Sequence, residues 1–124
     1  MNRYADIKQK LNLAEEAASL KVLADPTRLR LAVLLSPKGE TCVCTLAEIL
    51  AEPEYKISHH LSLMRSAGLV EARRDGTWMY YKLSRPRNHV EEYLWRCFRN
   101  YLADDKSMAV LKRLRALSRT EKGE

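Results

Sequence analysis

Residues 55–83, YKISHHLSLMRSAGLVEARRDGTWMYYKL, change from a helical to a strand-like hydrophobic period near their middle. In the first half, Ile57, Leu61 and Met64 are spaced by four and three residues, so they share one face of a helix. The pattern predicts a helix over residues 55–67 with a core face and an opposite polar face formed by Tyr55, His59, Ser62 and Ser66.

The second half of the stretch has a hydrophobic period of two, as half-buried strands do. Gly68 ends the predicted helix, and two strand-like runs, residues 69–74 and 77–83, then flank Asp75-Gly76. Asp-Gly is favoured where both central residues of a type I′ turn need positive φ. We therefore predict a tight β-hairpin with a type I′ turn directly after the helix.

Helical periods dominate the rest of the chain. Asp25-Pro26 has the form of a helix start, an N-cap residue followed by proline at the first helical position. Thr45 and Glu48 have the spacing of a capping box. We expect helices over residues 7–23 (one helix or two in succession), 26–35, 45–50, 87–102 and 108–117, and a disordered tail over 119–124.

A short supporting helix, a helix with a polar face and a tight hairpin follow one another in the order of a winged helix-turn-helix. The predicted fold class is mainly α with a small β-hairpin wing, in a single domain of residues 1–124. In this fold the helix over residues 55–67 reads the major groove of DNA and the hairpin reaches the neighbouring backbone. The net charge of +6 supports this placement, because residues 55–87 hold seven basic residues against two acidic ones.

Candidate DNA contacts follow from side-chain chemistry. Short or planar hydrogen-bonding groups suit base edges, and cationic groups suit phosphates. The predicted set is Lys56, Ser58, His59, His60, Ser62, Arg65, Arg73, Arg74 and Lys82. Any one of these polar side chains could instead simply face water. For His60, which turns part-way toward the core face of its helix, a buried structural role is the alternative.

The helices at the two ends of the chain carry more apolar surface than one winged domain requires. We expect residues 5–23 and 87–117 to form dimerisation helices, giving a homodimer that reads a pseudo-palindromic double-stranded DNA operator. Trp95, Phe98 and Tyr101 are the aromatic residues expected to anchor the interface. The alternative is that these helices only complete the core of the monomer.

Cys42 and Cys44 lie in GETCVCTLAEIL, residues 39–50, just before the predicted supporting helix. Residues i and i+2 of a helix point about 200° apart, so the two sulfurs can share an ion only where the backbone is extended or turned. Paired thiols select thiophilic ions, and a helix N-terminus favours the thiolate that binds them. A ligand there would pull on the supporting helix and shift the reading helix attached to it. Buried inert thiols are the alternative.

Three segments together resemble the ArsR/SmtB family of metal-sensing repressors, namely LADPTRLRLAVLL, GETCVCTLAEIL and KISHHLSLMRSAGLVEARRDGTWMYYKLS. The run ETCVCTL resembles the arsenic-sensing branch, whose motif is Glu-Leu-Cys-Val-Cys-Asp-Leu-Cys. The resemblance spans roughly residues 20–84. It implies a dimeric winged-helix repressor that leaves its operator when arsenite or antimonite, As(III) or Sb(III), binds, with no organic cofactor. It also implies that Cys42 and Cys44 are two of the ligands, and that Ser58, His59 and His60 match the Ser-Arg-His of the reader helix.

The sequence departs from the family pattern at both of its metal sites. The third cysteine of the branch falls on Ala47, so the three-thiolate pyramid that trivalent arsenic prefers does not close within the motif. Cys97 on the long helix is one candidate third ligand, from the same or the other subunit, with core packing as its alternative role. A small thiol is another candidate third ligand. At the family's second metal site only His89 matches, so we expect no zinc site there.

Several other function classes are compatible with parts of the sequence. Two share the fold, a redox or persulfide sensor using Cys42, Cys44 or Cys97 and a repressor responsive to divalent metals. A winged helix that binds protein instead of DNA is a third. An enzyme is not expected, because the cysteines lack a base oriented by a third group and no glycine-rich phosphate loop is present. The start MNRYADIKQK lacks an apolar signal region, and no apolar run reaches the length of a membrane span, so we expect a cytoplasmic protein.

Overall fold

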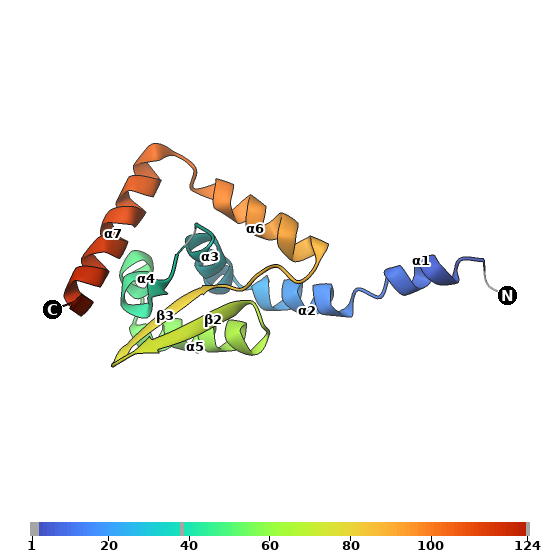
Figure 1. The fold of residues 1–124 in the computed structure, drawn as a ribbon, viewed down its shortest axis with the longest axis horizontal. Coiled ribbons are helices and arrows are strands. Elements are labelled where there is room, and N and C mark those ends of the chain that lie inside the picture. The colour runs from blue at the N-terminus through green and yellow to red at the C-terminus, as the bar shows by residue number, and fades with distance from the viewer. Residues whose placement is uncertain (1–2, 38, 124) are drawn as a thin grey trace.

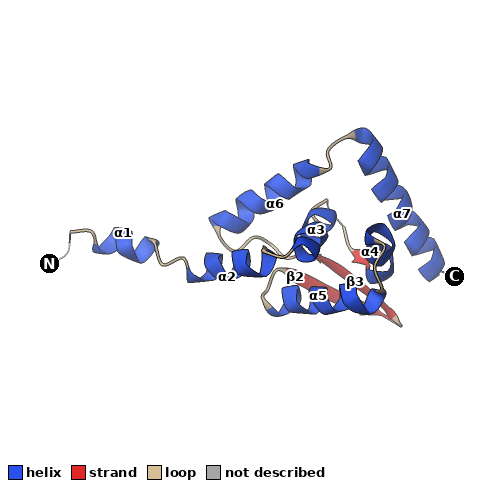
Figure 2. Cartoon of the chain, turned by 180° about the vertical axis from the view of Figure 1, so that it is seen from behind, coloured by secondary structure: helices blue, strands red, loops and turns tan. Residues whose placement is uncertain are grey.

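The computed structural model describes residues 3–37 and 39–123. In it α6 and α7 form two sides of a triangle around α3 and α4, and α5 lies along the hairpin of β2 and β3 (Figure 1, Figure 2). The elements are α1 (Ala5–Lys10), α2 (Ala14–Leu23), α3 (Pro26–Leu35), β1 (Thr41–Cys42), α4 (Val43–Leu50), α5 (Glu54–Ser66), β2 (Val70–Asp75), β3 (Trp78–Leu83), α6 (His89–Tyr101) and α7 (Asp105–Gly123). The predicted winged helix-turn-helix, mainly α with a small wing, is confirmed.

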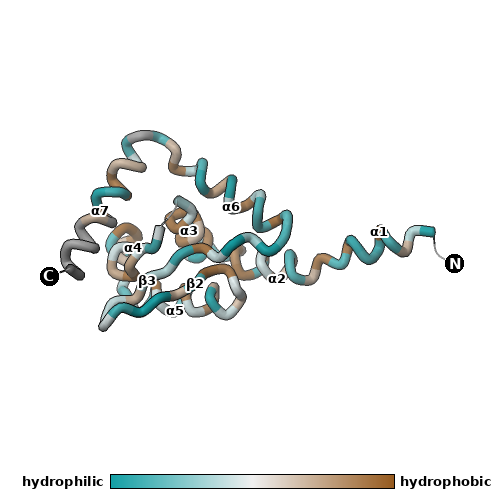
Figure 3. Tube along the Cα trace, in the orientation of Figure 1, coloured by the Kyte–Doolittle hydropathy of each residue, from teal (hydrophilic) through white to brown (hydrophobic). Residues whose placement is uncertain are grey.

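The core forms where α3, α4, α5 and the wing meet, and hydrophobic positions gather there (Figure 3). Ile57, Leu61 and Met64 are fully buried, as are Leu31 and Leu46 on the two neighbouring helices. Burying each such side chain contributes about 1.5–3 kcal/mol, so this stripe fixes the rotation of α5 about its own axis. The opposite face of α5 is thereby held toward solvent.

The wing is a three-stranded antiparallel sheet in the order β1-β3-β2. The sequence predicted the hairpin but placed its turn one residue too early. Asp75 pairs with Trp78, so the two-residue loop is Gly76-Thr77 rather than Asp75-Gly76. Of these two residues only Gly76 has positive φ, at 62°. The predicted type I′ turn is therefore wrong, because type I′ needs positive φ at both central residues whereas glycine first is the type II′ pattern.

The supporting helix α4 begins two residues earlier than predicted. Cys42 is its N-cap residue, and the Cys42 sulfur accepts a hydrogen bond from the Cys44 amide at 3.3 Å. The capping box predicted from Thr45 and Glu48 is wrong, because Thr45 already lies within the first turn. Thr41 and Cys42 form the strand β1, which the hydrophobic pattern did not reveal, since two residues are too short to show a period.

The aromatic residues of α6 divide between the core and the surface. Trp95 and Phe98 are buried, and the Trp95 indole nitrogen donates to the Ser84 carbonyl oxygen at 2.9 Å. Both residues therefore complete the core of the monomer, and their predicted role as interface anchors is corrected. Tyr93 and Tyr101 stay 64% and 73% exposed. These two tyrosines lie among exposed charged residues of α6, and the Arg96 guanidinium stacks over the Tyr93 ring at 5.6 Å from its centroid.

The C-terminal helix α7 folds back along α4 and β1 of its own chain (Figure 1). Leu111 is buried in the core, with Met108 packed against it. The helix continues through residues 119–123, where the sequence analysis expected a disordered tail, and Glu124 lies outside the described residues. This helix therefore covers part of the element that carries both neighbouring cysteines.

At the other end of the chain, residues 5–23 form two successive helices, one of the two forms expected. α1 has no buried residue and extends away from the rest of the molecule (Figure 1). α3 begins as predicted, with the Asp25 carboxylate accepting from the Arg28 amide at 3.0 Å. Among the described residues, no helix is both long and apolar enough to cross a membrane.

Candidate DNA-binding surface and thiol site

The exposed face of α5 carries most of the predicted base-reading groups. Ser58, His59 and Ser62 are exposed, as are Tyr55 and Arg65. The Lys56 ammonium is also exposed and lies 3.2 Å from the Glu52 carboxylate, one turn away. Because the buried stripe fixes the helix, this row of small hydrogen-bonding side chains is presented on a rigid support.

His60 is placed differently from the other predicted α5 contacts. Its side chain is only 14% exposed and packs against the start of α3, where Arg28 Nη1 lies 3.2 Å from its Nδ1. A guanidinium only donates, so Nδ1 accepts and the neutral ring carries its proton on Nε2. Burial lowers the pKa of His60 below 6.5, although the Asp25 carboxylate, 3.9 Å away, opposes this effect. His60 thus joins α5 to α3 rather than standing with the exposed residues.

Arg73 of the wing makes contacts that the sequence did not predict. Its Nε lies 2.8 Å and 3.0 Å from the two carboxylate oxygens of Glu40, and its guanidinium stacks over the Tyr80 ring at 4.8 Å from the centroid. Glu40 stands two residues before Cys42. The ion pair therefore ties the wing to the segment that leads into the cysteine pair.

Other basic residues around the reading face remain available to a polyanion. Arg65 follows the exposed serines along α5, and Arg74 lies on β2 near the wing tip. Lys82 lies near the end of β3, and Arg85 follows that strand. All four are exposed and form no ion pair within the described part of the chain, so their charges remain available to phosphate.

The two neighbouring cysteines meet the backbone condition for sharing one ligand. Cys42 is extended, with φ −68° and ψ 142°, and its sulfur folds over the first turn of α4 to reach the Cys44 amide. Cys42 is buried and Cys44 is half-buried. In the wing sheet Cys42 pairs with Tyr80 of β3. The same residue is thus the cap of the supporting helix and part of the wing.

Two buried hydroxyl groups flank the cysteine pair. The Oγ1 atoms of Thr41 and Thr45 have no hydrogen-bond partner among the described residues. Burying an unpaired hydroxyl costs about 1–3 kcal/mol. The cysteine pair therefore lies beside two hydroxyl groups whose hydrogen-bonding capacity is not met by the described residues. Soft thiol donors with polar neighbours fit a thiophilic ion such as trivalent arsenic. The site offers two sulfur atoms, from Cys42 and Cys44.

Cys97 lies apart from the other two cysteines. It is exposed on α6 and lines an apolar cavity of about 450 Å³ between α3 and α6, together with Leu34, Leu50, Phe98 and Tyr101. Within the described residues, no group of three or more cysteine, histidine or acidic side chains is arranged to hold a metal ion. In the described part of the chain, Cys97 is therefore not grouped with Cys42 and Cys44.

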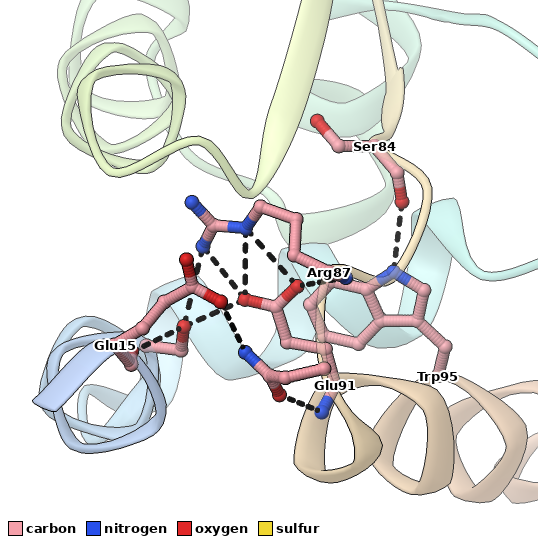
Figure 4. A network of polar contacts seen from close by, with 7 residues as sticks. Glu15, Ser84, Arg87, Glu91 and Trp95 are labelled. Carbon is pink, nitrogen blue, oxygen red and sulfur yellow. Dashed lines mark hydrogen bonds and ion pairs between the residues drawn. The ribbon is translucent and has the colours of Figure 1, made fainter. Parts of the chain in front are cut away.

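A polar network joins α2 and α6 to the turn after α5 (Figure 4). The Glu91 carboxylate, 1% exposed, accepts from Arg87 Nη2 at 2.6 Å and from the Ser19 hydroxyl at 2.7 Å. Burial alone would raise the pKa of Glu91, but the hydrogen bonds from Arg87 and Ser19 hold it below 4.5. A Cβ atom added at Gly68 would lie 2.5 Å from Arg87 Nη1, so the guanidinium rests against that turn. Arg87 is one of the seven basic residues counted in 55–87, and its partners in this network were not predicted from the sequence.

A polar helix face on a buried support, beside a basic wing, defines a winged helix-turn-helix regulator that binds DNA. Residues 25–72 match the sequence model described as bacterial regulatory protein, arsR family. The chain is 39% identical over 101 residues to the arsenical resistance operon repressor of Escherichia coli (strain K12), covering 76% of this chain and 80% of that one. The chain belongs to the ArsR family of transcriptional repressors.

Two further similarities show the range of the family. The cadmium resistance transcriptional regulatory protein CadC homolog of Staphylococcus aureus is 35% identical over 98 residues, covering 79% of each chain. The solved homodimeric winged helix-turn-helix domain of a possible ArsR-family regulator from Mycobacterium bovis has a TM-score of 0.56 and 35% identity, covering 79% of this chain and 83% of that one. These relatives and the fold are those of transcription regulators rather than enzymes.

Proposed function

We propose that this protein is an operator-binding repressor that leaves DNA when a trivalent arsenic or antimony compound binds Cys42 and Cys44. The observation that carries the proposal is the position of Cys42, which is at once the N-cap of α4 and a paired residue of the wing sheet. A ligand gripped by the two sulfurs would act on both DNA-contacting elements.

In the DNA complex, α5 lies in the major groove. Ser58, His59 and Ser62 contact base edges, and Lys56 and Arg65 contact phosphates. Arg74 and Lys82 of the wing contact the adjacent DNA backbone. Arg73 joins them when its ion pair with Glu40 opens. His60, held against α3, sets the angle between α5 and the body of the protein.

Two physical connections carry the ligand signal to DNA. Along the first, α4 packs against α5, so a shift of the α4 N-terminus moves the reading helix. Along the second, β1 pairs with β3 and Glu40 pairs with Arg73, so the same shift moves the wing. Cys42 and Cys44 would hold the arsenic through two As–S bonds between the cap residue and the first turn, and this link would shift the N-terminus of α4.

The functional unit in this proposal is a homodimer. Tyr4, Ile7 and Leu11 are 60%, 56% and 63% exposed on α1, an apolar stripe that the chain itself leaves uncovered. A second copy would bury this stripe and place two reading helices in successive major grooves. The M. bovis relative is described as homodimeric.

The proposal is tested by fluorescence anisotropy of a labelled operator fragment at fixed salt, titrated with arsenite, phenylarsine oxide, cadmium and zinc. The Cys42→Ser and Cys44→Ser variants should bind the operator as the parent does but lose its release by arsenicals. Cys97→Ser should be released normally. Unaltered release of Cys42→Ser would show that the inducer site is elsewhere.

A second candidate is regulation by oxidation, and the exposure of Cys97 beside an apolar cavity is the observation that favours it. Exposed thiols are the ones that oxidants reach first. In this case a peroxide or persulfide would release the operator, a monothiol reductant would restore binding, and Cys97→Ser would abolish the response. In the principal proposal a chelating dithiol restores operator binding, and the Cys97→Ser variant is still released by arsenicals.

A further inference from the structure

We propose that Ala47 makes the Cys42–Cys44 site a two-thiol site that selects mono-organic trivalent arsenicals, R–As(III), over inorganic arsenite when small thiols are abundant. This inference rests on the proposed function and names the class of its inducer. It follows from the number and placement of the thiols and from the valence of arsenic.

Ala47 occupies the position on α4 where a further ligand would be nearest. It follows Cys44 by three residues, so the two side chains lie on the same side of the helix. Its methyl group is 6% exposed and belongs to the core cluster with Val43 and Leu46. No donor atom is therefore offered from this turn of the helix.

The remaining neighbours do not supply a third soft ligand. The Thr41 and Thr45 hydroxyls are neutral oxygen donors, which form hydrogen bonds but do not replace a thiolate on a thiophilic ion. The chain has three cysteines, and Cys97 lines the separate cavity between α3 and α6. The site thus contributes two sulfur ligands and no third one.

Two thiols complete the three bonds of trivalent arsenic in an organic arsenical, which already has one As–C bond, but not in arsenite. R–As(OH)2 and two thiols give R–As(S–Cys)2 and two water molecules: two As–S bonds form, two As–O bonds break, and each hydroxide leaves with a thiol proton. Arsenic stays trivalent throughout. As(OH)3 reacts in the same way but keeps one hydroxide, which remains open to exchange.

Competition with small thiols then separates the two ligands. A monothiol in excess, such as glutathione, can form three As–S bonds with inorganic arsenic, one more than the protein offers. With R–As(III) it can form only two, the same number as the protein, and the protein gains from holding both sulfurs on one chain. The organic ligand should therefore stay bound under conditions that strip arsenite.

Native mass spectrometry of the full chain, with glutathione in large excess over arsenite or phenylarsine oxide, tests this directly. The parent should retain phenylarsenic with the loss of two protons, while arsenite is removed or carried as a mixed adduct with glutathione. Ala47→Cys should hold arsenite with the loss of three protons, raising its affinity relative to phenylarsine oxide by at least about tenfold. Ala47→Ser, which adds a side chain of similar size without a thiol, should show no such gain.

Four results would overturn the inference. One is a parent that holds arsenite with the loss of three protons and as tightly as phenylarsine oxide, because a third protein ligand would then exist. Another is equal gain from Ala47→Ser and Ala47→Cys. Absence of binding by either arsenical would remove the inducer site itself, whereas operator release by both arsenicals with equal potency in glutathione would remove only the selectivity. If circular dichroism shows that Ala47→Cys is unfolded, the parent spectra decide alone.

Discussion

Glu91 shows how a single buried charge holds separate elements together. Its carboxylate belongs to α6, yet it accepts from Ser19 of α2 and from Arg87, whose guanidinium rests against the turn after α5. Because the pKa of Glu91 is lowered, this contribution to stability is fully present above its ordinary pKa of 4.5 and is lost as the pH falls through the lower folded value. The network is thus intact at neutral pH.

Glu91→Gln should destabilise the fold because it leaves the Arg87 guanidinium without its counter-charge. The expected loss is about 2 kcal/mol, the usual range for a hydrogen bond to a charged group, since Arg87 is 35% exposed and partly solvated. Urea unfolding monitored by circular dichroism measures it. Glu92→Gln is the matched control, since its pair with Arg96 is exposed and should contribute no more than about 0.5 kcal/mol. Equal effects of the two variants would contradict the role assigned to the network.

His60 should give the protein a pH-dependent stability near neutrality. Burial lowers its pKa below 6.5, so the unfolded chain binds the proton more readily than the folded chain. The free energy of unfolding should therefore be highest above pH 6.5 and fall as the pH drops below that value. Asp25, which attracts the protonated ring, and Arg28, Lys56 and His59, which repel it, are the charged groups involved.

Denaturant unfolding of parent and His60→Gln at a series of pH values tests this expectation. The variant should show a flatter profile between about pH 7.5 and pH 5.5, a window that spans the ordinary histidine pKa. His59→Gln, a change of the same kind at the exposed neighbour, should keep the parent profile. A His60→Gln profile as steep as that of the parent would mean that the pH dependence arises elsewhere.

At the scale of elements, the wing and the cysteine strand behave as one unit. β1 pairs with β3, and Glu40 neutralises Arg73 of β2. Glu40→Gln leaves Arg73, among the described residues, only its longer pair with Asp75, at 3.7 Å, so Arg73 should contact phosphate more readily. Operator binding should tighten, and the slope of log K against log salt concentration should steepen by up to about one unit. Glu71→Gln removes the same charge from an exposed position on β2 and should change the slope less. Identical slopes for the two variants would show that Arg73 is not restrained by Glu40.

Elements with a long hydrophobic period were predictable from the sequence, and short or shared elements were not. The core face of α5 and the hairpin have enough residues to show periods of 3.6 and two. β1 has two residues, and the start of α4 depends on a sulfur cap, for which no common capping signal exists. The observed turn lies one residue later than predicted because register is set by pairing along the whole hairpin rather than by its two tip residues.

The residues of the candidate site were predictable from the sequence, but their hydrogen-bond and ion-pair partners were not. Nearly all of the predicted polar residues of α5 are exposed, and the cysteine pair has the extended backbone that sharing a ligand requires. Arg73 and His60 contact partners 33 and 32 residues away, and Arg87 reaches Ser19, 68 residues away. Contacts between residues so far apart leave no periodic trace in a sequence.

At the scale of the whole molecule, the described residues include one exposed apolar stripe. It is the α1 stripe of Tyr4, Ile7 and Leu11. Ile7→Asp should weaken self-association by at least about tenfold, because a charge would have to be buried at the interface. Sedimentation velocity over a range of concentrations measures it, with Lys8→Asp on the neighbouring face of α1 as the control. Equal dimerisation of both variants would exclude α1 from the interface.

The central claim is that the thiol site and the DNA-binding surface are coupled through α4 and the wing. Coupling between two sites is reciprocal, so the factor by which an arsenical weakens operator binding must equal the factor by which operator DNA weakens arsenical binding. Isothermal titration of phenylarsine oxide into the protein, with and without saturating operator, measures the second factor for comparison with the anisotropy value. Operator DNA should lower the arsenical affinity of the parent by that same factor; an arsenical affinity that is unchanged by operator DNA would contradict coupling between the two sites.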